Sequence, residues 1–252
     1  METDFYLGKN FIVTGASSGI GTGVSVELAA KGANIILIGR DKEKLERVCS
    51  SLPENGKHTF LSYDLSNVDG IQDLMNSIYA DYERIDGLAY CAGTNNKLRF
   101  KDLTFNQIIP IIKTNFFSFV EMVRCLSILK KRSDYLGVVG VSSLASNTNE
   151  KYMLSYSASK ASMESAVRVL ASELKPKNIF ISSVRPGFVD TPMNYQMNEL
   201  YGDFGKKIEM DGYQLYGLIP VHVVADMIIN LIGPDARFFS GGNLVIPAGA
   251  AC

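Results

Sequence analysis

The chain has 252 residues, of which 46% are hydrophobic and 20% are charged, and its formal net charge is −1. This length and composition are those of a globular protein with one large core, so we expect a single domain over residues 1–252. A charge so close to zero argues against nucleic acid or an anionic membrane as a partner. No apolar run reaches the roughly 20 residues needed to cross a bilayer, so no membrane span is expected.

Short apolar runs alternate with helical stretches along the chain. Strands separated by helical crossovers indicate a parallel sheet that is covered on both faces. The expected fold class is therefore α/β, a doubly wound parallel sheet that no linker or repeat divides. The strands are predicted at 10–15, 34–39, 58–64, 85–91, 136–143, 178–187 and 243–249, and the first three helices at 19–31, 41–52 and about 68–83.

The segment from Thr104 to Arg132 is apolar at nearly every position of its middle, which predicts a helix buried on all sides. Pro110 falls inside this segment and should kink the helix or delay its start. A doubly wound fold leaves one face of its outer helices to solvent, so a symmetric partner could cover the apolar stripe 108–123. We therefore expect a homo-oligomer.

Tyr156 and Lys160 stand four residues apart in the run YSASK, which reads as helix, so their side chains share one face. A free tyrosine hydroxyl has a pKa of about 10 and is a poor acid at neutral pH. A lysine ammonium beside it favours the phenolate and should lower that pKa towards the working range. The pair therefore predicts a proton donor.

The run TGASSGIG at 14–21 follows a predicted strand and opens a predicted helix. Glycines let such a turn close and let its backbone approach a pyrophosphate at the helix N-terminus. A plain tight turn is the alternative reading. Together with the proton donor, this Rossmann-type turn predicts hydride transfer between a dinucleotide and a carbonyl group.

Cys49, Cys91, Cys125 and Cys252 are scattered, with no C-x-x-C pair and no histidine at ligand spacing. They are expected to be reduced thiols, and no metal site is expected. The first residues show no basic segment followed by a long apolar stretch, so no signal peptide is expected. These features favour a cytoplasmic protein.

Further motifs lie at fixed separations from these two. TGASSGIG, CAG at 91–93, Asn115, Ser143, YSASK and RPG at 185–187 occur in the order and at the spacings of the short-chain dehydrogenase/reductase family. The chain resembles that family over essentially its whole length. The resemblance implies a single Rossmann-type domain.

The resemblance also implies a catalytic set of Asn115, Ser143, Tyr156 and Lys160. Ser143, which lies 13 residues before Tyr156, would donate to the substrate carbonyl oxygen and stabilise charge there. Lys160 would also bind the nicotinamide ribose, and Asn115 would hold a water that extends a proton relay. Taken alone, Ser143 could simply end a strand, and Asn115 could bond backbone at a helix kink.

Two residues bear on the choice of cofactor. Members of the family that bind NAD carry an acidic residue where this chain has Gly39, and Arg40 follows it, able to pair with a 2′-phosphate. NADP(H) is therefore expected, although Arg40 could instead start a solvated helix. The residues expected to contact the cofactor are Thr14, Gly15, Ser17, Gly19, Ile20, Gly21, Arg40, Asp64, Leu65, Ala92, Gly93, Tyr156, Lys160, Pro186, Gly187, Val189 and Thr191.

Beyond Thr191, methionines and aromatic residues alternate irregularly with glycines. This pattern predicts a mobile lid over an apolar ligand at about 191–217, with ordinary surface packing as the alternative. The family's NNAG is YCAG here, so Tyr90 and Cys91 replace two asparagines. That change is expected to alter hydrogen bonding between strands more than the chemistry.

The leading hypothesis is an NADPH-dependent reductase that converts a ketone to a secondary alcohol. The chain resembles the 3-oxoacyl-[acyl-carrier-protein] reductase-like branch, so a 3-oxoacyl thioester is the expected substrate type. Ser172 stands where that branch has arginine, which weakens delivery by a carrier protein.

Two alternatives stay open. One is a sugar or small-alcohol dehydrogenase, which the polar loop Ser146–Lys151 would suit, and the other is a non-catalytic nucleotide-sensing protein. Because the family commonly packs the helices of 104–132 and of Tyr156 against symmetry mates, a homotetramer is expected, with a dimer as the fallback.

Overall fold

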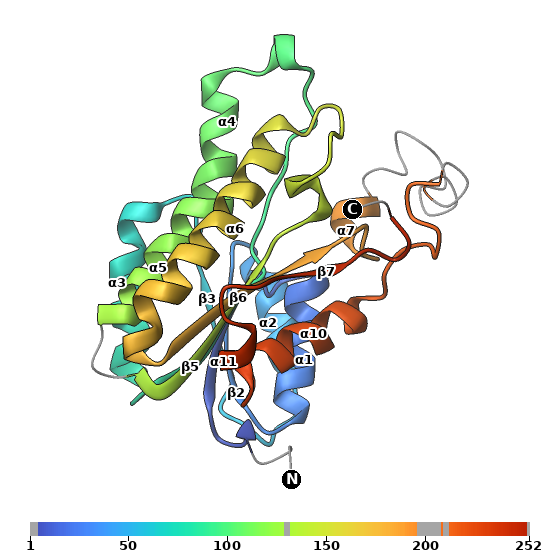
Figure 1. The fold of residues 1–252 in the computed structure, drawn as a ribbon. Coiled ribbons are helices and arrows are strands. Elements are labelled where there is room, and N and C mark those ends of the chain that lie inside the picture. The colour runs from blue at the N-terminus through green and yellow to red at the C-terminus, as the bar shows by residue number, and fades with distance from the viewer. Residues whose placement is uncertain (1–4, 129–131, 196–207, 209–211, 251–252) are drawn as a thin grey trace.

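The computed structural model describes residues 5–128, 132–195, 208 and 212–250 (Figure 1). Its centre is one sheet of seven parallel strands in the order β3-β2-β1-β4-β5-β6-β7. The order reverses direction between β1 and β4, which confirms the expected doubly wound α/β fold. The strands are β1 Asn10–Thr14, β2 Asn34–Gly39, β3 Thr59–Ser62, β4 Ile85–Tyr90, β5 Arg132–Val141, β6 Ile179–Pro186 and β7 Asn243–Ile246.

Helices connect these strands and begin close to the positions that the sequence predicts. β5 begins at Arg132, four residues before its predicted start, and its pairing with β4 is irregular between Ile85 and Gly87. The α-helices are α1 Gly19–Ala30, α2 Lys42–Ser51, α3 Ile71–Asp81, α4 Phe105–Ile112, α5 Ser118–Ile128, α6 Leu154–Leu174, α7 Pro192–Tyr195, α10 Val221–Ile232 and α11 Ala236–Phe239. Short 3-10 turns occur at Val68–Gly70, Phe100–Asp102, Leu144–Ser146 and Lys175–Lys177.

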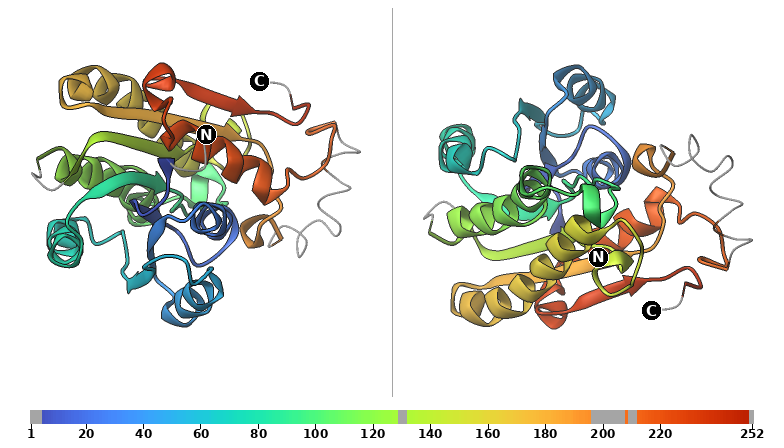
Figure 2. Two further views of the ribbon diagram at one scale, coloured as in Figure 1. Left: turned by 90° about the horizontal axis from the view of Figure 1, so that it is seen from below. Right: turned by 90° about the horizontal axis from the view of Figure 1, so that it is seen from above.

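Two helical layers enclose the sheet (Figure 2). Alternate residues of β1 point to opposite faces, so Phe11 and Val13 pack with α1, α2 and α10, while Ile12 packs with α3, α5 and α6. Both faces are therefore dry. This explains why β2 is a continuous apolar run after its first residue, since each of those residues is buried. Every residue of β4 is buried as well, including Asp86, whose carboxylate pairs with Arg84 at 3.0 Å.

The segment after Thr104 differs from the single buried helix that its composition predicts. Pro110 lies within α4 without ending it, and a π-helical turn at Lys113–Phe117 separates α4 from α5. The predicted burial on all sides is wrong for the chain alone, because the side chains of Phe105 and Phe117 are 72% and 43% exposed. The reason is geometric: α4 projects past the ends of the strands (Figure 1), where it packs mainly against α6 and the π turn.

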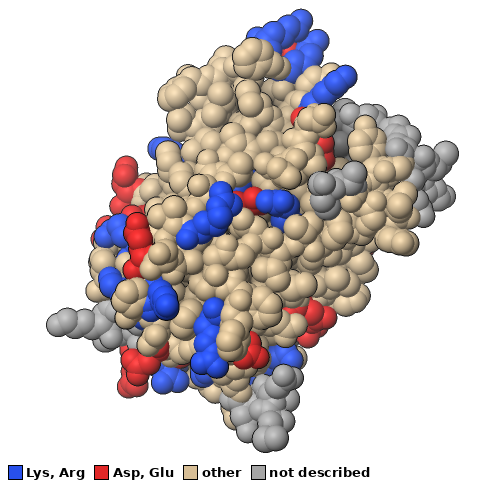
Figure 3. All heavy atoms as spheres, viewed as in Figure 1, with Lys and Arg blue, Asp and Glu red and all other residues tan. Residues whose placement is uncertain are grey.

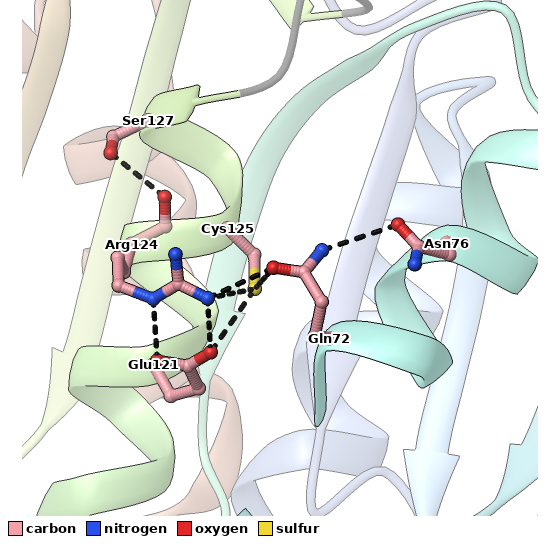
Figure 4. Close-up of polar contacts among 6 residues, drawn as sticks. All are labelled: Gln72, Asn76, Glu121, Arg124, Cys125 and Ser127. Atoms are coloured by element: carbon pink, nitrogen blue, oxygen red, sulfur yellow. Dashed lines mark hydrogen bonds and ion pairs between the residues drawn. The ribbon is translucent and has the colours of Figure 1, made fainter. Parts of the chain in front are cut away.

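A polar cluster joins α3 to α5 (Figure 4). The Arg124 guanidinium donates to Glu121 at 2.7 Å and to Gln72 Oε1 at 2.9 Å, and Cys125 Sγ lies 3.5 Å from the same oxygen. Burial raises the pKa of the Cys125 thiol to about 11, so it stays protonated at neutral pH. Cys49, Cys91 and Cys125 are free thiols, as the sequence predicts for them.

Candidate active site

A cavity of about 460 Å³ opens at the carboxyl ends of β1, β4, β5 and β6. It lies where the strand order reverses, the place at which open α/β sheets bind their ligands. Its volume is in the range of small-molecule sites. Among the described residues, no three His, Cys, Asp or Glu side chains gather as a metal ion would require.

The glycine-rich turn forms one wall of this cavity. Gly15 has φ +63°, and a Cβ there would lie 2.9 Å from the backbone of Ala92. A Cβ on Gly21 would lie 2.3 Å from the carbonyl oxygen of Gly15. Because α1 begins at Gly19, the N–H groups of its first turn, which have no partner within the helix, lie at the cavity wall. This is an arrangement suited to a pyrophosphate.

The cavity brings together the residues expected to contact the cofactor, with one correction. Thr14 lies behind the wall, where its Oγ1 accepts a hydrogen bond from Ala92 N at 3.1 Å and ties the end of β1 to the CAG turn. The residues of the predicted set that line the cavity are Gly15, Ser17, Gly19, Ile20, Gly21, Arg40, Asp64, Leu65, Ala92, Gly93, Tyr156, Lys160, Pro186, Gly187, Val189 and Thr191.

One end of the cavity is formed by the ends of β2 and β3. Ser17, Gly39 and Arg40 line it there, and a Cβ on Gly39 would be 3.4 Å from Ser17 Oγ. The nearby carboxylate of Asp41 is engaged elsewhere, since it accepts a hydrogen bond from Lys44 N at 3.0 Å and caps α2. This end therefore presents a cation and a hydroxyl at the position where a carboxylate would repel a phosphate.

Tyr156 and Ser143 lie on the opposite wall, one on α6 and the other just after β5. Burial raises the pKa of Tyr156 above its ordinary value, while a hydrogen bond with Ser143 acts in the opposite direction. The expectation that Lys160 lowers this pKa is therefore wrong, because the loss of hydration of the phenolate dominates. Tyr156 is a protonated phenol at neutral pH.

Lys160 is fixed to the sheet. Its Nζ donates to the carbonyl oxygen of Val141 at 2.6 Å and lies 5.6 Å from the centre of the Tyr156 ring. Burial lowers the pKa of Lys160 to about 8, against the raising effects of Cys91 and Glu164. The ammonium is thus charged at neutral pH but titrates within reach of physiological conditions.

Asn115 is buried in the π turn and does not line the cavity. Its Oδ1 accepts from Thr94 N at 2.8 Å, and its Nδ2 donates to Thr94 O and Ser159 Oγ, both at 2.9 Å. These contacts join the π turn to the backbone of Thr94, which lines the cavity, and to the Ser159 side chain on α6.

Tyr90 supports the same turn. Its hydroxyl donates to the carbonyl oxygen of Thr114 at 2.5 Å, across the interior from β4 to the π turn. The tyrosine that stands in place of the family's asparagine therefore contacts the turn that holds Asn115.

The remaining wall is formed by residues after β4 and after the Leu144–Ser146 turn. The sequence predicts the polar loop 146–151 near the substrate. No sequence motif indicates that the stretch after the CAG motif also forms part of the wall. Burial raises the pKa of Glu150, and the nearby charge of Lys97 opposes this. The lining residues here are Thr94, Asn95, Lys97, Leu144, Ala145, Thr148, Asn149, Glu150 and Met153.

The predicted lid at 191–217 lies partly outside the described residues, namely at 196–207 and 209–211. Its described ends reach the cavity through Met193, Asn194 and Gln214. Gln214 is fully buried and is tied to Phe188, accepting from its N–H at 2.7 Å and donating to its carbonyl at 3.0 Å. No sequence pattern marked Gln214.

A model of the short chain dehydrogenase family matches residues 9–201, which is most of the chain. The chain belongs to the short-chain dehydrogenase family. This confirms the resemblance drawn from its motifs, and it makes the protein an oxidoreductase of that family.

Relatives of this short-chain dehydrogenase carry different names. It is 28% identical to a 3-oxoacyl-[acyl-carrier-protein] reductase from Buchnera aphidicola, over 94% of this chain and 95% of that one. It is 26% identical to a glucose 1-dehydrogenase from Gluconobacter oxydans, over 98% of this chain and 93% of that one. At nearly equal identity, these two relatives carry names that denote different substrates.

Solved structures agree with the fold. A 3-oxoacyl (acyl-carrier-protein) reductase from Agrobacterium tumefaciens, solved with NADP bound, aligns with a TM-score of 0.88 at 22% identity, covering 99% of this chain and 97% of that one. An L-sorbose reductase from Gluconobacter frateurii, solved with NADPH and L-sorbose, aligns with a TM-score of 0.88 at 19% identity, covering 99% and 98%. At these identities the likeness concerns the fold.

Proposed function

We propose that this short-chain dehydrogenase is an NADPH-dependent reductase that converts a ketone to a secondary alcohol. The observation that carries the proposal is the meeting of Ser143, Tyr156 and Lys160 on one wall of a cavity whose other wall is the glycine turn. Asn115 is the fourth member of the proposed catalytic set. It lies behind that wall and is hydrogen-bonded to Thr94 and Ser159.

The chemistry follows from the protonation states. A bound nicotinamide cofactor would supply the hydride for the carbonyl carbon. Ser143 donates a hydrogen bond to the carbonyl oxygen, where negative charge develops, and Tyr156 gives its proton to the same oxygen. The raised pKa of Tyr156 keeps that proton in place until it is needed. The Lys160 ammonium then favours the phenolate that forms.

The proposed preference for NADP(H) is supported by Arg40 and Ser17 beside Gly39. A guanidinium pairs well with a phosphate, and the end of β2 carries Gly39 in place of a carboxylate that would repel one. The Agrobacterium and Gluconobacter frateurii proteins, solved with NADP and NADPH, share this fold and support the same choice.

A 3-oxoacyl thioester is the first candidate substrate, supported by the names of the Buchnera and Agrobacterium relatives. A keto sugar or similar polar carbonyl compound is the second, and a specific observation favours it. The wall beside Tyr156 carries Thr148, Asn149 and Glu150, which can hydrogen-bond hydroxyl groups. A non-catalytic role is disfavoured because Ser143, Tyr156 and Lys160 are all present.

Loss of NADPH absorbance distinguishes these functions when the wild type is mixed with a short 3-oxoacyl coenzyme A thioester, the matching carrier-protein thioester, L-sorbose or a small ketone. Turnover of the thioesters alone supports the first candidate, and turnover of the keto sugar alone supports the second. The Tyr156→Phe variant is the matched control, since it removes only the transferable proton. Absence of turnover with every compound would contradict the proposed activity.

We also propose a homotetramer. Phe105 and Phe117 leave large apolar areas exposed, as does Leu154 at the start of α6. Few charged side chains cover the surface over α4 and the first part of α6 in Figure 3. An exposed apolar area of this kind suits contact with a second copy of the chain.

A cytoplasmic location is proposed as well. Cys49, Cys91 and Cys125 are free thiols, and free thiols are maintained in reducing compartments. Cell fractionation with an antibody against the protein tests this, and recovery with secreted proteins would contradict it. Separately, no helix in the described ranges combines the length and apolarity that a bilayer span needs.

A further inference from the structure

A buried carboxylate lies behind the catalytic wall and takes no part in the chemistry proposed above. Glu164 on α6 is 4% exposed and does not line the cavity. Its Oε1 accepts from Ser142 Oγ at 2.6 Å, from Ser146 Oγ at 2.7 Å and from Arg185 Nε at 2.9 Å, while Arg185 Nη2 donates to its Oε2. Burial raises the pKa of Glu164, but these donors outweigh burial and hold the pKa below its ordinary value.

The two serines stand on either side of Ser143. Ser142 is the first residue after β5, and its N–H donates to Val184 O at 2.7 Å. Ser146 ends the 3-10 turn that Ser143 caps, and its N–H donates to Ser143 O at 3.0 Å. Glu164 therefore accepts hydrogen bonds from the residue directly before Ser143 and from the third residue after it, on both sides of the serine.

The carboxylate sits on the same helix as the proposed acid. Glu164 follows Tyr156 by eight residues and Lys160 by four, so the three side chains form one row along α6. Ala145, inside the turn that Ser143 caps, packs against Tyr156 in a small buried cluster. The relative position of the Ser143 and Tyr156 hydroxyls is thus set by how firmly this turn is attached to α6.

The bonds to Glu164 divide into two groups with different consequences. Arg185, on β6, makes an ion pair that neutralises the buried carboxylate and ties α6 to the sheet. The serine bonds are not needed for that neutralisation, because Arg185 already contacts both carboxylate oxygens. What the serine bonds add is a constraint on the turn that carries Ser143.

We propose that Glu164 is a positioning residue, which fixes Ser143 relative to Tyr156 by accepting hydrogen bonds from Ser142 and Ser146. The inference rests on the roles proposed for Ser143 and Tyr156. A displacement of about 1 Å at a reacting group can lower a rate about 100-fold, so a loosened turn should lower kcat without weakening the cofactor.

The double variant Ser142→Ala/Ser146→Ala tests this while leaving the Glu164–Arg185 pair intact, so the protein should fold. We expect kcat to fall by roughly 10- to 100-fold, within the effect of misplacing a reacting group. The Kd of NADPH by calorimetry should stay within about twofold. Amide hydrogen exchange at 145–147 should become at least about tenfold faster, because the turn opens more easily.

Two further variants sharpen the test. Ser162→Ala is the matched control, because Ser162 donates to the carbonyl oxygen of Ala158 on the same helix and does not contact the turn. It should keep wild-type kcat and exchange. Glu164→Gln keeps the size of the side chain but removes its charge, and it should lower kcat in the same direction and also lower Tm, since Arg185 loses its ionic partner.

The outcomes separate cleanly. A double variant that keeps kcat within twofold of wild type overturns the proposal, and so does a fall in kcat matched by an equal loss of NADPH affinity. If wild type reduces no carbonyl compound, the proposed activity fails by itself. The exchange measurement then still tests the positioning role of Glu164. Unchanged amide exchange at 145–147 in the double variant overturns that role, and faster exchange supports it.

Discussion

Replacing Lys160 by methionine should change how the stability of the protein depends on pH. The Lys160 side chain is 2% exposed, and burial lowers its pKa from 10.5 to about 8. Below pH 8 the lysine is charged in the folded and unfolded states, so the folded state carries the full cost of burying the charge. Between pH 8 and 10.5 only the unfolded state keeps the proton, so the free energy of unfolding rises with pH.

The size of the effect follows from the two pKa values. A difference of about 2.5 pH units, at about 1.36 kcal/mol per unit, corresponds to about 3 kcal/mol of unfolding free energy. Most of this, about 2–3 kcal/mol, should be regained by the wild type between pH 7 and pH 10. The Lys160→Met variant has no such group and should not gain it.

Urea unfolding of both proteins at pH 7 and pH 10 measures this difference. The twelve tyrosines and the other lysines also titrate near pH 10, but they are common to both proteins and cancel in the comparison. If the unfolding free energies of the wild type and the variant change by the same amount between pH 7 and pH 10, the reasoning is refuted. That result would mean that water or a rearranged polar side chain solvates the Lys160 ammonium.

Three further predictions concern activity and assembly. Tyr156→Phe should lower kcat at least about 100-fold with an unchanged Kd for NADPH, since only a general acid is lost; a variant that keeps a tenth of wild-type kcat would show that another group is the acid. Arg40→Ala should weaken NADPH binding by about 1–3 kcal/mol while NADH binding changes little, as calorimetry would show. Equal affinity of the wild type for the two cofactors would count against a 2′-phosphate site. Light scattering at micromolar concentration should give four times the chain mass of 27.6 kDa, and a value near one chain would rule out the oligomer.

The sequence predicted the sheet well because buried parallel strands are written as continuous apolar runs. NIILIG at 34–39 forms β2 over those residues, and TGASSGIG forms the turn into α1. The stretch after Thr104 was predicted less well, since a long apolar run does not reveal a π turn. Its exposure also depends on where α4 projects, which is a property of the whole fold rather than of the segment.

Spacing singles out Ser143 rather than its neighbour Ser142. Both residues line the cavity, but Ser143 is the one that hydrogen-bonds with Tyr156, while the Ser142 hydroxyl donates to Glu164. Glu164 and Arg185 could not have been paired from sequence, because they are 21 residues apart and a glutamate on a helix usually faces solvent. The raised pKa of Tyr156 was equally hidden, because helical spacing shows which side chains are neighbours but not how dry the site is.

The π turn at Lys113–Phe117 makes the length of its segment as important as its composition. A π turn contains about one residue more than an α turn, so the helix after it is rotated by roughly 100° relative to an uninterrupted helix. The turn absorbs this extra residue, and α5 buries Met122 and Leu126 in the core. Losing one residue from the turn should convert it to an α turn and leave both side chains in the core, whereas losing one residue from within α5 should rotate the side chains that follow it out of the core. A deletion scan would show it: the chain without Lys113 should fold, and the chain without Glu121 should not.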